Sequence, residues 1–246
     1  MKFIKYSIAL IICFALSVPA MAQRSTRSQG EVPPPKTKKA AQEQTVPHRS
    51  KKRSPQNTGV VAGQIRPRVF LNPGHGGHDS DDRPCPFYNE GMQARVEYYE
   101  SDSNLKGAMA MKDILRSRGY EVFMSRVNNT TDDDLNLFEI HQLALNSGAD
   151  VFFAIHSNSS GSATRRVNFP FAIYRGYDGG GTAEGSEELA GIVASNLADC
   201  EATSWSRGGL THGDWSFYRN RSGLGVFRWN KLPGILVENC FHDYQI

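Results

Sequence analysis

Short apolar runs alternate with amphipathic segments along the chain from Val69 onward. An apolar run of three to five residues that is bounded by Gly, Pro or polar residues is typical of a buried strand. On this criterion we predict strands at 69–71, 121–124, 151–155, 171–174, 224–227 and 235–237.

Between these strands, apolar residues recur at the three- and four-residue spacing of a helix that buries one face. We predict helices at about 104–118, from a cap at 132–134 to Gly148, and at 186–199. Asp102 or Ser103 is the expected cap of the first helix, and Gly119 its end. The segments 79–99 and 201–220 are expected to be irregular. Single helices between strands indicate an α/β domain with a mostly parallel, twisted sheet of about six strands flanked by helices.

The first 22 residues have the features of a secretory signal peptide. Lys2 and Lys5 form a basic start, an apolar run extends from Tyr6 to Val18, and Ala20-Met21-Ala22 is a small-x-small cleavage site before Gln23. The run is short for a bilayer span, although an uncleaved anchor is the alternative. No later segment is apolar enough to cross a membrane, so we expect an exported protein without a stable membrane span.

Residues 23–67 have a composition that predicts a disordered, basic, Pro-rich linker. The segment contains Pro33-Pro34-Pro35 and lacks aromatic residues. Of the whole chain's charged residues, 23 of the 25 acidic ones and 15 of the 28 basic ones fall from Val69 onward, so the domain that follows the linker has a net charge of −8. Export argues against nucleic acid as a partner, so anionic envelope polymers are the partners that this basic segment favours. A solvated tether without a specific partner is the alternative.

Polar side chains follow several of the predicted strands, at the edge where sites form in parallel sheets. His75 follows the first strand, His156 the strand at 151–155, and Glu238 the strand at 235–237, while Glu100 lies just before the first helix. Two histidines and a carboxylate are a common ligand set for catalytic zinc, and a further carboxylate can act as a general base. Taken singly, each residue also fits a structural role in a turn, a strand end or a helix start. No His-Glu-x-x-His helix is present.

Four segments that contain these residues follow one another along the chain: Asn72-Pro73-Gly74-His75-Gly76-Gly77, Glu100-Ser101-Asp102-Ser103-Asn104-Leu105, Ile155-His156-Ser157-Asn158 and Leu236-Val237-Glu238-Asn239-Cys240-Phe241. Together they resemble the signature blocks of zinc-dependent N-acetylmuramoyl-L-alanine amidases of the amidase-3 type, over about residues 68–246. Ser125-Arg126 also resembles the end of the family's second strand.

The resemblance implies a six-stranded α/β fold with one catalytic Zn²⁺ ion. His75, Glu100 and His156 would bind zinc, and Glu238 would be the catalytic carboxylate. The substrate would be the amide between N-acetylmuramic acid and L-alanine of the peptidoglycan stem, cleaved by zinc-activated water in the periplasm or cell envelope during cell-wall remodelling or daughter-cell separation. The alternatives are a zinc peptidase or deacetylase on another envelope amide, or a non-catalytic peptidoglycan-binding protein.

The sequence departs from the family pattern at Asn72, where Asp is more usual; we expect this to affect support of the turn rather than metal binding. Glu90 and Glu97 compete with Glu100 as the third ligand. Glu100 is preferred because it alone precedes the family-like Asn-Leu pair at the matching offset. His78, His141, His212 and His242 are expected to have surface or core roles, with His212 the most plausible exception.

Overall fold

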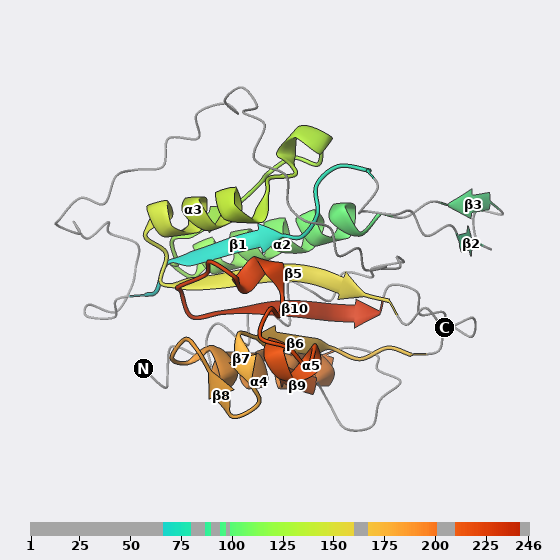
Figure 1. Ribbon diagram of the computed structural model, residues 1–246. Coiled ribbons are helices and arrows are strands. Elements are labelled where there is room, and N and C mark those ends of the chain that lie inside the picture. Colours follow the sequence, from blue (N-terminus) through green and yellow to red (C-terminus); the bar gives the residue numbers. More distant parts are fainter. Residues whose placement is uncertain are drawn as a thin grey trace.

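A six-stranded sheet forms the centre of the computed structural model (Figure 1), with the strand order β4-β1-β5-β10-β6-β9. The structure describes residues 66–79, 99–159, 167–200 and 210–241, together with the backbone of 87–89 and 94–96. The predicted signal peptide and nearly all of the predicted linker therefore lie outside the described residues.

The strands run in two directions. In sheet order they are β4 (Val122–Met124), β1 (Val69–Pro73), β5 (Val151–Asn158), β10 (Gly234–Phe241), β6 (Phe171–Tyr174) and β9 (Leu210–Gly213). Every neighbouring pair is parallel except β10 and β6, which are antiparallel. The predicted α/β class with a mostly parallel sheet is confirmed.

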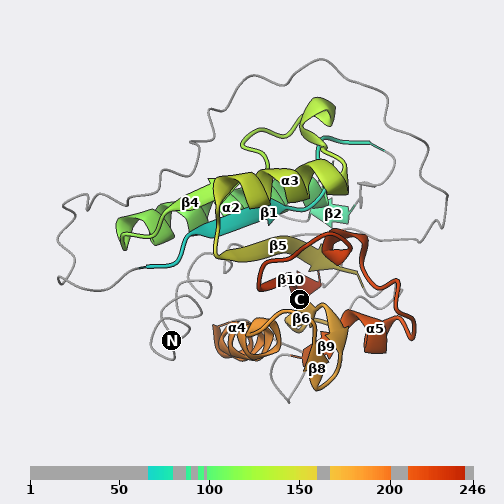
Figure 2. The same cartoon turned by 60° about the vertical axis from the view of Figure 1, so that its left-hand side comes forward.

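Helices cover both faces of this sheet. They are α2 (Glu100–Ser117), α3 (Leu137–Ser147), α4 (Ser186–Cys200) and the short α5 (Asp214–Phe217), with 3₁₀ turns η1 (Thr131–Asp133) and η2 (Gly225–Phe227). Apolar residues of α2 and α4 share one core with the sheet, and α3 and η2 contribute to the other. In Figure 2, α2 and α3 lie by the β1–β5 half and α4 by the β6–β9 half.

Alternating side chains explain how the strands join both cores. Along β5, Phe153 and Ile155 enter the core beneath α2 and α4, whereas Phe152 and Ala154 enter the core beneath α3. Successive residues of a strand point to opposite faces, so a strand covered on both faces must be apolar throughout. The uninterrupted run at 151–155 is apolar for this reason.

The apolar run 224–227 was predicted as a strand, and this prediction is wrong. Residues 225–227 form η2, in which the Phe227 N–H donates to the Leu224 carbonyl at 3.1 Å. Phe227 is 1% exposed and belongs to the core on the α3 side. A four-residue apolar run can bury a large side chain whether it forms a single helical turn or a strand, and apolarity alone does not distinguish the two.

Helix starts also differ from the prediction. Helix α2 begins at Glu100, four residues earlier than expected, and its N-cap is Tyr99 without a side-chain cap bond. Helix α3 is capped by Asn136, whose side chain accepts from the N–H groups of Phe138 and Glu139; Asp132 and Asp133 lie in η1 instead. Asn136 and Glu139 form a capping box, in which side-chain oxygens accept hydrogen bonds from more of the free N–H groups at the helix start than an acidic run would.

Segments predicted to be irregular contain short regular elements. An antiparallel pair, β2 (Phe87–Asn89) with β3 (Ala94–Val96), lies within 79–99, and β9 with α5 lies within 201–220. A further small pair joins β7 (Gly176–Tyr177) to β8 (Gly180–Gly181). These strands have two to four residues, too short for a periodicity signal. Within the described part of the chain, no helix has the length and apolarity needed to span a bilayer.

Two glycines make a matched test of helix geometry. Gly148 caps α3 with a left-handed φ of 65°, whereas Gly191 lies inside α4 and an added Cβ would meet nothing within 4 Å. We expect Gly148→Ala to destabilise the protein by about 1 kcal/mol and Gly191→Ala to stabilise it by about 0.5–1 kcal/mol. Urea unfolding of both variants measures the difference; equal shifts in the same direction would contradict it.

Candidate metal centre

The carboxyl ends of β1, β5 and β10 meet at one edge of the sheet, and three of the predicted site residues come from these ends (Figure 1). His75 lies in the turn after β1, His156 on β5, and Glu238 on β10 in register with His156. Glu100 reaches the same edge as the first residue of α2. All four predicted residues are therefore brought together.

The turn after β1 is shaped to bring two histidines together. His75 has a φ of 59°, a left-handed conformation that is uncommon outside glycine. A Cβ on Gly74 would lie 2.1 Å from Cε1 of His156, so only glycine lets that ring pack against the turn. The two imidazole rings lie 5.1 Å apart, edge to face.

Glu100 connects the two histidines. Its Oε1 lies 3.1 Å from His156 Nδ1 and accepts from the Ser157 N–H at 3.1 Å, while its Oε2 lies 3.5 Å from His75 Nε2. Asn104, one turn later in α2, donates to Oε1 at 3.2 Å and to the Gly74 carbonyl at 3.3 Å. These bonds fix the carboxylate of a residue that is only 7% exposed.

The donor set fits a divalent metal ion. One ligand atom from each of His75, Glu100 and His156 can be chosen so that all lie within 4.8 Å of one another. Ligands bound to one zinc ion at about 2.1 Å in tetrahedral geometry lie about 3.4 Å apart, close to the distances that Glu100 makes with each histidine. The competing ligands Glu90 and Glu97 lie outside the described residues.

Glu238 lies beside this cluster, in register with His156 on the neighbouring strand. Its Oε2 atom is buried and has no hydrogen-bond partner among the described residues. Burial, and secondarily the negative charge of Glu100, raise the pKa of Glu238 well above its usual range. A carboxyl group held in this way is suited to exchange protons with a reacting molecule.

A buried arginine, to which the sequence analysis assigned no role, holds the turn and the helix together. Arg126 follows β4 and is 3% exposed. Its guanidinium donates to the carbonyls of Pro73, Gly74 and Ser101 at 2.9–3.2 Å, and to the Asn128 carbonyl and Asn129 Oδ1 at 3.0 Å. The sequence signals were its position after a predicted strand and the resemblance of Ser125-Arg126 to the end of the family's second strand, and neither indicated these hydrogen bonds.

Asn72 supports the same edge, as the sequence analysis expected for a turn residue. It is buried, and its Oδ1 accepts a hydrogen bond from Ser125 Oγ at 2.7 Å. The other described histidines lie outside the cluster. His141 is buried in α3, the exposed His78 pairs with Asp102, and the partly exposed His212 pairs with Asp178. His242 lies outside the described residues.

Comparison with known proteins adds a family match. Residues 69–245 match the family model described as N-acetylmuramoyl-L-alanine amidase. The chain is 29% identical over 177 residues to the sporulation-specific N-acetylmuramoyl-L-alanine amidase of Bacillus subtilis, which covers 72% of this chain and 56% of that protein. The chain thus spans little more than half the length of this relative.

Two solved structures have the same fold. Cwp6 from Clostridium difficile matches with a TM-score of 0.56 and 26% identity, over 72% of this chain and 25% of that one. The N-acetylmuramoyl-L-alanine amidase AmiC2 of Nostoc punctiforme matches with a TM-score of 0.52 and 22% identity, over 74% of this chain and 84% of that one.

Replacing Arg126 should damage the cluster more than replacing a surface arginine. Arg126→Lys keeps the charge but cannot span the carbonyls of the turn and helix, so we expect a loss of about 2–4 kcal/mol in unfolding free energy and weaker metal binding. Arg116→Lys is the control, because Arg116 donates one hydrogen bond, to the Val122 carbonyl at 2.8 Å. Urea unfolding and zinc titration of both variants test this. Equal losses of stability and of zinc affinity in the two variants would contradict the role of Arg126 in holding the turn and the helix together.

The raised pKa of Glu238 predicts a pH-dependent instability in chelator-treated protein. A carboxyl group whose pKa is raised on folding favours the folded state below its unfolded pKa, and this contribution is lost as the pH rises through the folded pKa. Metal-free Glu238→Gln should therefore match the metal-free parent near pH 4 and exceed its stability at pH 7.5 by about 1–3 kcal/mol. Unfolding curves at both pH values provide the measurement, and a constant difference would contradict the assignment.

Proposed function

The chain belongs to the N-acetylmuramoyl-L-alanine amidase family, and on that premise we propose that it hydrolyses the amide between N-acetylmuramic acid and L-alanine of the peptidoglycan stem. The observation that carries the proposal is the convergence of His75, Glu100 and His156 beside the buried, unpartnered carboxylate oxygen of Glu238. A hydrolase needs a site that activates water and a group that moves its proton, and these side chains supply both.

We assign His75, Glu100 and His156 as the ligands of one zinc ion. Two imidazoles and one carboxylate leave a position open for chemistry, as in other catalytic zinc sites. Bound zinc would supply Lewis acidity toward water and toward the amide carbonyl. The hydrogen bonds from Ser157 and Asn104 orient Glu100, and such outer contacts keep a ligand carboxylate in place.

Glu238 is assigned as the proton carrier. It accepts a proton from the attacking water and delivers it to the departing nitrogen, so that the amide C–N bond breaks as a new C–O bond forms. In the metal-free site its pKa is raised by burial first and then by the negative charge of Glu100, so the group has an increased affinity for a proton. The products are a lactyl carboxylate on the sugar and a free amine on L-alanine.

We further propose that the domain works outside the cytoplasm, in the periplasm or cell envelope, during cell-wall remodelling or daughter-cell separation. The proposed organisation is a signal peptide at 1–22, a basic linker at 23–67 that contacts anionic envelope polymers, and a catalytic domain at 68–246. The composition of the first 67 residues supports this organisation, since the basic, aromatic-free segment follows an apolar run and a small-x-small site.

Mass spectrometry of digested peptidoglycan tests the reaction directly. We expect the purified protein to release stem peptides that begin with L-alanine, and expect chelation or Glu238→Gln to reduce the rate at least about 10²-fold. Internally cut peptides would favour a peptidase, released acetate a deacetylase, and binding without products a non-catalytic protein.

The metal ligands have a separate test. His75→Ala, His156→Ala and Glu100→Ala should each lower the zinc content measured on the folded protein, whereas Glu90→Ala and Glu97→Ala should leave it unchanged. Full zinc content in Glu100→Ala together with loss in either of the other two glutamate variants would reassign the third ligand.

A further inference from the structure

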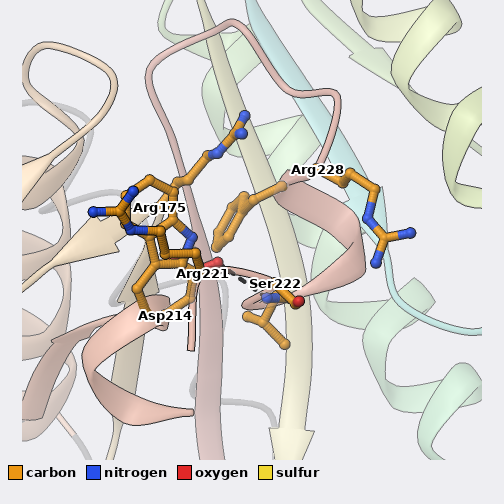
Figure 3. Close-up of a pocket in the computed structure, with 8 residues that line it drawn as sticks. Arg175, Asp214, Arg221, Ser222 and Arg228 are labelled. Atoms are coloured by element: carbon orange, nitrogen blue, oxygen red, sulfur yellow. Dashed lines mark hydrogen bonds between the residues drawn. The ribbon is translucent and has the colours of Figure 1, made fainter. Parts of the chain in front are cut away.

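A cavity lies at the end of the sheet opposite the candidate metal centre. It has a volume of about 280 Å³ and is lined by Arg175, Asp214, Trp215, Arg221, Ser222, Leu224, Phe227 and Arg228. Arg175 follows β6 and Asp214 follows β9, and both strands run antiparallel to β10, so they end far from Glu238. In Figure 3, Arg175 and Arg221 lie on one side of the cavity and Arg228 on the other.

The loop that forms this cavity is held in a fixed shape. The carboxylate of Asp214, which is 1% exposed, accepts from the N–H groups of Gly176 at 2.8 Å and Leu224 at 3.0 Å. Asn220 Oδ1 accepts from the N–H groups of Ser222 and Gly223. Gly223 has a φ of 49°, and a Cβ there would lie 2.0 Å from Asp214 Oδ2. The cavity is therefore preformed, which lowers the entropic cost of binding.

The arginines around the cavity have neutral contacts. Arg175 donates to the Asn230 carbonyl at 3.4 Å, Arg221 donates to the Tyr177 hydroxyl at 3.3 Å, and the Arg228 guanidinium lies 5.6 Å from the ring centre of Trp229. Within the described residues, no ion pair within 4.0 Å involves any of the three.

The surrounding sequence adds to this positive charge. Between Asp214 and Glu238 the chain has four cationic side chains and no acidic one, although the domain from Val69 onward has a net charge of −8. The pKa of buried His141 is lowered by burial first and then by the positive charges of Lys231 and Arg175, which is consistent with cations whose field extends into the protein. A local basic site in an acidic domain favours an anionic ligand.

We propose that this cavity binds an acidic sugar, a pyranose ring that bears a carboxylate. Guanidinium groups match the two oxygens of a carboxylate in a bidentate geometry. Trp215 and Leu224 supply apolar surface for a ring, and Ser222 adds a hydroxyl for its polar groups. A cavity of this size, at the low end for small-molecule pockets, admits a single sugar rather than a peptide.

The reaction assigned to the metal centre makes such a sugar, and this part of the inference rests on the proposed function. Hydrolysis converts the neutral amide on the lactyl group of N-acetylmuramic acid into a carboxylate. Glycan strands stripped of their stem peptides therefore bear one carboxylate on each processed muramic acid. The cavity would bind these stripped strands and hold the protein where stem peptides have already been removed.

NMR titration of the Glu238→Gln protein with N-acetylmuramic acid tests the site without turnover. We expect saturable shifts of the indole N–H signal of Trp215, identified among the three tryptophans by Trp215→Phe. N-acetylglucosamine, which has the same ring without the carboxylate, should cause none. The double variant Arg175→Gln/Arg221→Gln should weaken binding about tenfold or more.

Arg219→Gln is the matched control, because it removes one charge from the same loop without changing the lining of the cavity. It should bind N-acetylmuramic acid as the parent does. Equal weakening by Arg219→Gln, absence of binding, or binding of inorganic phosphate in preference to N-acetylmuramic acid would each overturn the acidic-sugar assignment. Failure of the wild-type protein to release L-alanine peptides, with this binding intact, would overturn the proposed function and leave the site standing.

Discussion

A single buried guanidinium fixes the relative position of the two segments that form the candidate metal centre. Arg126 hydrogen-bonds the carbonyls of Pro73 and Gly74 on one side and that of Ser101 on the other, so the His75 turn and the start of α2 cannot move independently. A buried charge is tolerated only when its donors are satisfied, and here five acceptors satisfy it. The positions of His75 and Glu100 relative to each other therefore depend on the backbone hydrogen bonds that Arg126 makes on both sides.

The sheet supplies the rest of the geometry. His156 and Glu238 are more than 80 residues apart, yet they are direct neighbours in register on β5 and β10. In-register neighbours on adjacent strands lie about 4.8 Å apart and point to the same face. Glu238 is also close enough to Glu100 that the negative charge of Glu100 adds to the effect of burial in raising the pKa of Glu238. A divalent cation beside them would offset this repulsion, which gives the cluster an electrostatic reason to bind metal.

The strand-end histidines and Glu238 were predictable from sequence because the carboxyl ends of parallel strands meet at one edge. The start of α2 was not, because Tyr99 caps it without a side-chain bond, and the sequence offered the better caps Asp102 and Ser103. The role of Arg126 could not be predicted either, since four of its five acceptors are backbone carbonyls, from three separate segments. The apolar run 224–227 failed as a strand because its burial comes from a 3₁₀ turn. Sequence patterns thus located the candidate reactive side chains but did not reveal the hydrogen bonds to the backbone that hold them in place.

The antiparallel pairing of β6 with β10 also sets the scale on which the protein would meet the proposed polymer. Strand β6 begins beside Glu238 and ends beside Arg175, so its four residues, about 13 Å of extended chain, separate the candidate metal centre from the proposed sugar site. If both sites are used, each protein molecule would bind one glycan strand of the wall through the cavity while it removes stem peptides from another. Its activity would then depend on the spacing of neighbouring glycan strands.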